Sequence, residues 1–283
     1  MVFDTQKIKA IVCDMDGTIL FPGATLGENT VSVLKKCIKQ GLHIILATGR
    51  SVFAAEKYRA EIGAEGPMIY YNGAEIVDMP KGTILYSSLL PPEAAIFCVN
   101  LARERGIHFH VFFIDDKDAS TEILVSENPS QAAVAYAERT GLNFKYGNLL
   151  NDLSMPNPPL CAKGLFIGSD GALEEIRSAL REEFGDKLTV VKSASTFLEV
   201  LNAGTSKGRA LEALFKIRGL ESDNILAFGD EENDIAMLKI AGFSAAPANA
   251  TEAVKKIAKT VIGANTEEGV AAFLEENFLK DTL

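Results

Sequence analysis

Apolar, strand-like runs alternate with helical segments at both ends of this 283-residue chain. The first part is predicted to hold strands at residues 8–13, 42–47 and 68–71 and helices at 29–40 and 51–62. From residue 206 the same alternation returns, with helices at 206–217, 231–238, 250–257 and 267–275 and strands at 224–228 and 242–245. This rhythm is typical of a parallel sheet with helices on both faces.

The middle of the chain has a different texture. A hairpin is predicted at residues 75–78 and 83–86, and after Pro91-Pro92 the strands and helices no longer alternate regularly. The expected strands there are 108–114, 122–126, 163–167, 188–192 and 196–201, the helices are 93–105, 130–140 and 171–184, and 148–159 reads as an irregular connection. We therefore predict an α/β fold: a doubly wound, Rossmann-like parallel-sheet core (residues 1–86 and 203–283) with an inserted α+β domain (residues 87–202).

Composition excludes several classes of protein. A net charge of −10 without a basic stripe argues against a nucleic-acid binder. No apolar run is long enough for a membrane span, and the first residues lack the pattern of a signal peptide. The four cysteines form no CxxC pair, which argues against a zinc site: Cys13, Cys37, Cys98 and Cys161. We expect a cytoplasmic protein.

Two carboxylates follow the first predicted strand. Asp14 and Asp16 alternate on an extended backbone, so both side chains should emerge on one face at the end of the strand. Carboxylates so close repel each other unless a cation or a proton relieves them, and Gly17 lets the chain turn away sharply. The pattern suggests a divalent-metal site, although Asp and Gly are also ordinary turn residues.

Three further polar clusters stand at strand ends or helix starts. Thr48-Gly49-Arg50 follows the strand at 42–47 and could bind an anion, or Thr48 could simply cap the next helix. Asp230 and Asp234 follow the strand at 224–228, where acids also favour the start of a helix. Lys207 lies near a helix start, a position that the helix dipole disfavours, which suggests a function beyond solvation.

In this order, the clusters resemble the four motifs of the haloacid dehalogenase-like phosphohydrolase superfamily. The matching residues are Asp14-Met15-Asp16-Gly17-Thr18, Thr48, Lys207 and Gly229-Asp230 with Asn233-Asp234. Three more stretches resemble its Cof-type branch, subclass IIB, in which the insertion is a cap: Ala47-Thr48-Gly49-Arg50, Tyr71-Asn72-Gly73-Ala74 and Ser206-Lys207-Gly208. The departures are Met15, where leucine is commoner, and Leu201-Asn202-Ala203-Gly204, which lacks a frequent proline.

The resemblance implies a role for each matching residue. Asp14 would be the nucleophile, Asp16 the general acid and base, and Lys207 a catalytic cation. Mg²⁺ would be held by Asp14, the Asp16 backbone carbonyl and Asp230, with Asp234 binding through water or orienting Lys207. The phosphate and substrate would contact Met15, Thr48, Gly49, Asn72, Gly73, Asn202, Lys207 and Asn233, with Asn72, Gly73, Glu199 and Asn202 at the seam between core and cap. Arg50 would hold the phosphate or pair with an acid.

The implied activity is a Mg²⁺-dependent phosphatase acting on small phosphorylated metabolites, with sugar phosphates expected first. The alternatives are a phosphomutase of the phosphomannomutase type and a non-catalytic phosphometabolite-binding protein. A mutase needs a second phosphate site, and the candidate cap arginines are scattered in sequence: Arg103, Arg105 and Arg139. We interpret His108 and His110 as structural, since no third metal ligand is evident. The sequence leaves the oligomeric state open.

Overall fold

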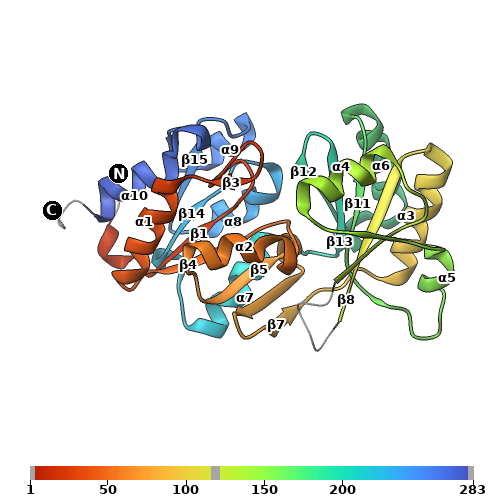
Figure 1. Ribbon diagram of the computed structural model, residues 1–283, viewed down its shortest axis with the longest axis horizontal. Helices are drawn as coiled ribbons and strands as arrows, with labels where there is room; N and C mark the ends of the chain where they lie inside the picture. Colours follow the sequence, from red (N-terminus) through yellow and green to blue (C-terminus); the bar gives the residue numbers. More distant parts are fainter. Residues whose placement is uncertain (1–3, 116–121, 280–283) are drawn as a thin grey trace.

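The computed structural model describes residues 4–115 and 122–279, which form two lobes (Figure 1). The segments from both ends of the chain make up one lobe, and the middle segments make up the other. We call them the core lobe and the cap lobe. The exact division at residues 87 and 202 stays a prediction.

The core lobe contains a five-stranded sheet in which all neighbours are parallel. Its order is β16 (Thr260–Ile262), β15 (Phe243–Pro247), β14 (Ile225–Phe228), β1 (Ala10–Cys13) and β4 (His43–Leu46). Short 3₁₀ turns connect several elements: η1 (Thr5–Lys7), η4 (Ser222–Asn224) and η6 (Asn265–Glu267). Residues 20–21 (β2) and 25–26 (β3) form a small hairpin.

Alternate residues of β1 enter two different hydrophobic clusters. Ile11 and Cys13 pack in one cluster with α1 (Glu28–Lys39), α2 (Val52–Ile62) and α10 (Gly269–Phe278). Ala10 and Val12 pack in the other, with α7 (Lys207–Arg218), α8 (Ile235–Ile240) and α9 (Glu252–Ile257). Since side chains of a strand alternate between faces, helices cover both faces of the sheet, and the predicted doubly wound α/β core is confirmed.

One predicted strand joins a different sheet. β5 (Gly66–Tyr70) pairs antiparallel with β6 (Glu75–Met79), which pairs with β7 (Thr83–Ser87). The β pairing of β5 with the main sheet is an isolated parallel bridge between Ala47 and Ile69. β5 is therefore not a full strand of the parallel sheet, because its hydrogen bonds go to the hairpin that follows it.

The cap lobe contains a six-stranded, mostly antiparallel sheet. Its order is β10 (Phe144–Tyr146), β9 (Glu122–Ser126), β8 (His108–Ile114), β11 (Leu160–Ile167), β13 (Phe197–Asn202) and β12 (Leu188–Ala194). One face, which includes Val111 and Val200, packs in a cluster with α3 (Pro92–Arg105) and α6 (Asp170–Phe184). The other face, with Phe112 and Leu165, joins the hydrophobic cluster of the core lobe together with Tyr136 of α4 (Gln131–Thr140).

Three details differ from the sequence-based expectation. The segment expected to be irregular contains α5 (Leu149–Leu153), whose first turn is capped by the Asn148 side chain. The helix expected at 231–238 is divided into η5 (Glu232–Asp234) and α8, because the Asp234 side chain accepts the amides of Asp230 and Glu231. The short strands β10 and β16 were not predicted.

The two segments that connect the lobes are held together by side chains. Ser88, just after β7, forms a 2.7 Å hydrogen bond with Thr205, just before α7. The Asn202 amide donates to the Ser88 hydroxyl at 3.2 Å. The two segments that connect the lobes are therefore hydrogen-bonded to each other at Ser88.

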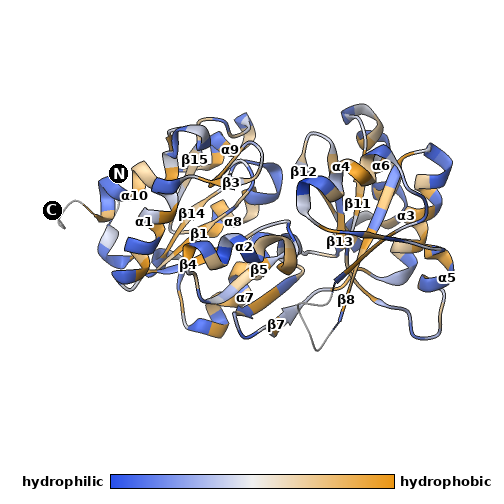
Figure 2. Ribbon diagram, viewed as in Figure 1, coloured by the Kyte–Doolittle hydropathy of each residue, from blue (hydrophilic) through white to orange (hydrophobic). Residues whose placement is uncertain are grey.

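Apolar residues concentrate on the inner strands, as Figure 2 shows. The four cysteines are buried and unpaired. Within the described residues, no helix combines the length and the apolar character needed to cross a membrane.

The two cap histidines form a hydrogen-bonded pair. His108 Nε2 lies 3.0 Å from His110 Nδ1, and His108 Nδ1 lies 2.9 Å from the Ser130 hydroxyl. Burial lowers the pKa of His108 to about 4. Burial, and then the charges of His108 and Lys163, hold the pKa of His110 well below its ordinary 6.5. The folded cap therefore keeps both rings neutral.

Stability should fall with acid because of this pair. Between pH 6.5 and about 4 the unfolded chain binds protons that the folded chain does not, so the free energy of unfolding decreases as the pH falls. For each of the two imidazoles, the free energy of unfolding changes by at most about 1.4 kcal/mol per pH unit. Urea unfolding at pH 7.5, 6.5, 5.5 and 4.5 measures it. His110→Phe should flatten the curve, whereas His43→Asn, at an exposed histidine, should not. Equal slopes in His110→Phe and wild type would contradict this account.

Candidate active site

The predicted acidic and hydroxyl residues converge at the carboxyl edge of the parallel sheet. β1 lies between β14 and β4, and its last residue, Cys13, is paired with Phe228 and Leu46. Asp14, Asp230 and Thr48 follow these three strands within two residues. Because parallel strands end at the same edge, the register alone brings the three side chains to one place.

Lys207 connects two of the carboxylates. Its ammonium lies 2.5 Å from Asp14 Oδ1 and 2.7 Å from Asp234 Oδ1. The Lys207 and Asp234 side chains are fully buried. Lys207 is the first residue of α7. The start of this helix packs directly against the backbone of Gly73, where a Cβ would overlap the Ser206 carbonyl. Gly73 thus positions Lys207 through close backbone packing.

Asp234 has both carboxylate oxygens occupied. Oδ1 contacts Lys207, and Oδ2 accepts the amides of Asp230 at 2.9 Å and Glu231 at 3.1 Å. Asp230 Oδ1 accepts the Thr18 hydroxyl at 2.8 Å, and a Cβ at Gly17 would overlap the Asp230 carboxylate. Asp234 therefore organises the loop, while Asp230 and Asp14 keep oxygen atoms available.

Carboxyl groups outnumber ammonium groups in this buried cluster. Asp14, Asp230 and Asp234 bring ligand atoms within 4.8 Å of one another, and Lys207 is the ammonium bound among them. Burial, and then repulsion from Asp234, raise the pKa of Asp14 to about 7. Burial, and then repulsion from Asp14, raise the pKa of Asp230 to about 9. The oxygen ligands and the excess of carboxyl groups fit a hard divalent cation such as Mg²⁺.

Asp16 is held by Arg50. The guanidinium donates two 2.7 Å hydrogen bonds, from Nε to Asp16 Oδ2 and from Nη2 to Oδ1, so the pair is bidentate. The Asp16 side chain is 46% exposed, whereas that of Arg50 is 7% exposed. Burial acts to raise the pKa of Asp16, but the hydrogen bonds and charge of Arg50 outweigh it and the pKa lies below its usual value. Asp16 is ionised in this arrangement.

A second group of polar residues borders the carboxylates. Thr48 is buried, and its hydroxyl oxygen accepts the Arg50 amide at 3.0 Å. Asn233 donates to the Asn72 carbonyl oxygen at 2.8 Å. Among the described residues nothing pairs with the buried Asn72 Nδ2 or Asn233 Oδ1. Gly49 lies against the Asn72 amide, where a Cβ would come within 3.0 Å.

Met15 and Asn202, two predicted contact residues, do not line the cavity described below. Met15 is fully buried in the core, and its carbonyl accepts the amides of Thr18, Ile19 and Leu20. Asn202 bonds Ser88 and its neighbour's amide at the lobe connection. Met15 can meet a ligand only through its backbone, and Asn202 has a position suited to joining the lobes.

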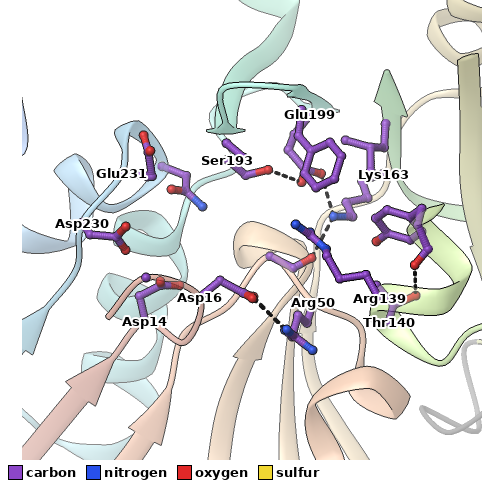
Figure 3. A pocket seen from close by; sticks show the side chains of 17 residues that line it. Asp14, Asp16, Arg50, Arg139, Thr140, Lys163, Ser193, Glu199, Asp230 and Glu231 are labelled. Carbon is purple, nitrogen blue, oxygen red and sulfur yellow. Dashed lines mark hydrogen bonds and ion pairs between the residues drawn. The ribbon is translucent and has the colours of Figure 1, made fainter. Parts of the chain in front are cut away.

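A cavity of about 230 Å³ lies between the lobes above the carboxylates (Figure 3). From the core lobe it is lined by Asp14, Asp16, Gly17, Gly49, Arg50, Asp230, Glu231 and Asn233. From the cap lobe it is lined by Tyr136, Arg139, Thr140, Lys163, Leu165, Ser193, Ala194, Phe197 and Glu199. Carboxylates of the core lobe and side chains of the cap lobe thus face the same space.

A buried ion pair forms the cap wall of the cavity. Lys163 Nζ lies 2.6 Å from Glu199 Oε2, and the two side chains are 1% and 4% exposed. Ser193 donates to Glu199 Oε1 at 2.7 Å, and Lys163 also donates to the Gly49 carbonyl of the core lobe at 2.7 Å. Buried ion pairs cost desolvation free energy, so one that lines a cavity is a candidate for ligand recognition.

Sequence reasoning had identified Glu199 but not Lys163, Ser193 or Arg139 as cavity residues. Lys163 is a single charge within the otherwise apolar run of residues 160–167, and that contrast was an available signal. Lys163 and Leu165 alternate on β11, so they share a face, and Leu165 is paired with Glu199 of β13. Nothing local marks Ser193 or Arg139. The histidine pair contributes no metal site, since among residues 4–115 and 122–279 the metal-competent cluster is Asp14, Asp230 and Asp234.

Comparison with known proteins agrees with this geometry. Residues 11–274 match the family model described as haloacid dehalogenase-like hydrolase. A protein of Haemophilus influenzae is 33% identical over 95% of this chain and 97% of its own length. The HMP-PP phosphatase of Serratia proteamaculans is 30% identical over 93% of this chain and 92% of its own. The crystal structure of a haloacid dehalogenase-like hydrolase from Bacteroides thetaiotaomicron superposes with a TM-score of 0.82 at 29% identity, covering 96% of this chain and 100% of that one.

Proposed function

This chain belongs to the haloacid dehalogenase-like hydrolase family, and from that premise we propose that it is a Mg²⁺-dependent phosphatase of small phosphorylated metabolites. Sugar phosphates are the first class to test. The observation that carries the proposal is the buried cluster of three carboxylates, two of which, Asp14 and Asp234, bind Lys207. A nucleophilic carboxylate beside a cation site is the arrangement that phosphoryl transfer through an aspartyl-phosphate needs.

We assign the metal to the oxygens that remain available. Asp14, Asp230 and the Asp16 backbone carbonyl would hold Mg²⁺, while Asp234 acts by fixing Lys207 and the loop. The excess of carboxyl groups and the all-oxygen donor set support this assignment. Bound Mg²⁺ would offset the repulsion between the anionic nucleophile and the anionic phosphate.

In the first step an Asp14 oxygen attacks phosphorus, and the bond from phosphorus to the leaving oxygen breaks. Asp16 supplies the proton that the leaving oxygen takes up. In the second step water attacks the aspartyl-phosphate, Asp16 accepts the proton of the water, and inorganic phosphate and Asp14 are released. The first step needs Asp16 in its protonated form, but Asp16 bound to Arg50 is ionised. Arg50 must therefore release this carboxylate before the first step, whereas the ionised form is suited to the second.

Several side chains are suited to hold the phosphoryl oxygens. Lys207 supplies a buried ammonium, and Thr48 and the Gly49 amide border the carboxylates. The unpartnered Asn72 Nδ2 is a buried donor beside Asn233 within the described site. Preorganised donors of this kind stabilise the charge that develops on the phosphoryl group. The cap wall of Lys163 and Glu199 would then contact the leaving group.

Mg²⁺ binding should strengthen as the pH rises. In the metal-free protein, burial and then repulsion from neighbouring carboxylates raise the pKa of Asp14 to about 7 and the pKa of Asp230 to about 9. A cation must therefore displace protons at pH 6.5, whereas fewer protons remain at pH 8.5. Excess Mg²⁺ should raise Tm above its value in about 5 mM EDTA, and this increase should be larger at pH 8.5 than at pH 6.5.

A pair of matched variants tests whether the increase in Tm comes from Mg²⁺ bound at the acidic cluster. Asp230→Asn should remove most of the Mg²⁺-induced shift, while Asp186→Asn, at an exposed carboxylate of η3 (Gly185–Lys187), should keep it. A shift of the same size in Asp230→Asn and wild type would place the metal elsewhere.

The proposed activity is tested on a panel of phosphorylated metabolites with Mg²⁺ and with EDTA. A phosphatase releases inorganic phosphate and dephosphorylated product in equal amounts. A phosphomutase would instead return an isomeric phosphate ester with little free phosphate. Binding without either product would identify a non-catalytic protein.

A further inference from the structure

Arg139 reaches from the last turn of α4 into the cavity between the lobes (Figure 3). Its guanidinium carbon lies 4.5 Å from the centre of the Phe197 ring. Stacking on an aromatic face orients a guanidinium while its N–H edges stay free to donate. The side chain is exposed, so a ligand in the cavity can reach it.

The other two cations that line this cavity already have acidic partners. Arg50 is bound to Asp16 by two hydrogen bonds, and Lys163 is bound to Glu199 and to the Gly49 carbonyl. Among the described residues, no carboxylate lies within ion-pair distance of Arg139. The cap end of the cavity therefore presents a guanidinium that has no ion-pair partner in the described part of the protein, and its charge helps to lower the pKa of Asp16 on the core side.

A helix-stabilising role explains only part of this arrangement. A positive side chain in the last turn favours the helix dipole, and Arg139 occupies such a position. The dipole does not require the side chain to lie over Phe197 and face the carboxylates. Arg103, which likewise lies in the last turn of its helix α3, is paired with Glu127 at 2.5 Å and does not line the cavity.

We propose that Arg139 binds a second anionic group, a carboxylate or a phosphate, on the leaving group of the substrate. The proposal rests on the proposed function, because it names the substrate class of the same cavity. The phosphoryl group would lie at Asp14 and the second anion at the opposite, cap end. The cavity, of about 230 Å³, is suited to a small metabolite. Planar, bidentate recognition of carboxylate or phosphate is what a guanidinium does best.

The test compares substrates that differ in the second anion. Glucose 6-phosphate is matched with 6-phosphogluconate, and fructose 6-phosphate with fructose 1,6-bisphosphate. For the wild type, kcat/KM should be higher for the doubly anionic member of each pair. Arg139→Gln should lower kcat/KM for that member by about tenfold to about a hundredfold and change the other by less than about threefold. Arg139→Lys should be intermediate, and Arg103→Gln should match the wild type.

Two outcomes would overturn the inference while leaving the phosphatase intact. The wild type could show no preference within either pair, or Arg139→Gln could lower kcat/KM equally for both members. In either case, the wild type should still release phosphate from p-nitrophenyl phosphate with Mg²⁺, and Asp14→Asn should not. That result would support the proposed phosphatase function without a role for Arg139. If the wild type hydrolyses neither p-nitrophenyl phosphate nor any panel member, the proposed function fails, and the role of Arg139 fails with it.

Discussion

Replacing Asp14 by asparagine is expected to abolish turnover and leave the fold intact. The amide has nearly the shape of the carboxylate but is a poor nucleophile, so no aspartyl-phosphate should form. We expect kcat to fall on the order of a thousandfold or more, as when other enzymes lose their nucleophile. In metal-free protein the substitution also removes one of three mutually repelling buried carboxylates, so Tm should not fall sharply.

The measurement is the initial rate of phosphate release at saturating substrate and Mg²⁺, together with circular dichroism and thermal unfolding. Asp186→Asn makes the same chemical change at an exposed site of the cap lobe and should retain full activity. Retention of more than a few percent of the wild-type rate by a folded Asp14→Asn protein would rule out the aspartyl-phosphate mechanism.

The Asp16→Asn variant should slow both half-reactions and change substrate affinity little. An amide can neither supply nor accept the proton, and general acid–base catalysis contributes about a hundred- to ten-thousand-fold. Single-turnover experiments would follow loss of the ester and release of phosphate separately. The pH dependence of the rate should also change, because the titrating carboxylate is gone.

Arg50 complicates this variant, because Asp16 accepts both of its hydrogen bonds. Asp16→Asn leaves the guanidinium without its acidic partner, and the freed Arg50 could block the cavity. The double variant Asp16→Asn/Arg50→Gln separates the two effects. We expect it to be as slow as Asp16→Asn alone. Recovery toward the wild-type rate would mean that the single variant was slow because of Arg50, and that another group handles the proton.

The acidic edge of the core sheet could be predicted because short-range sequence patterns specify it. An apolar run followed by Asp14-Met15-Asp16-Gly17 predicts a strand end with two carboxylates, and the same reasoning applies to Asp230 and Thr48. Parallel strands in a doubly wound sheet all end at the same edge, so residues more than 200 positions apart meet without further information. The resemblance to family motifs added Lys207, which contacts Asp14 across 193 positions.

The cap wall could not be predicted in the same way. Alternation on β11 and β13 specifies which residues share a face, but not which face meets the core lobe. That choice depends on how α3 and α6 cover one face and leave Lys163, Leu165 and Glu199 toward the carboxylates. Asn202 lies at the seam between the lobes, as expected, where it bonds Ser88, and its contact with substrate stays a prediction.

The sequence by itself determined the fold class and the acidic cluster, because periodicity and strand-end chemistry are local and a parallel sheet aligns them; Lys207 came from the order of the motifs. The tertiary structure decided that Arg50 binds Asp16, that Asp234 uses both oxygens within the protein, and that Arg139 faces the cavity without an acidic partner among the described residues. These contacts join side chains from separate elements and lobes. Their partners are selected by packing and charge in three dimensions, which no local pattern encodes.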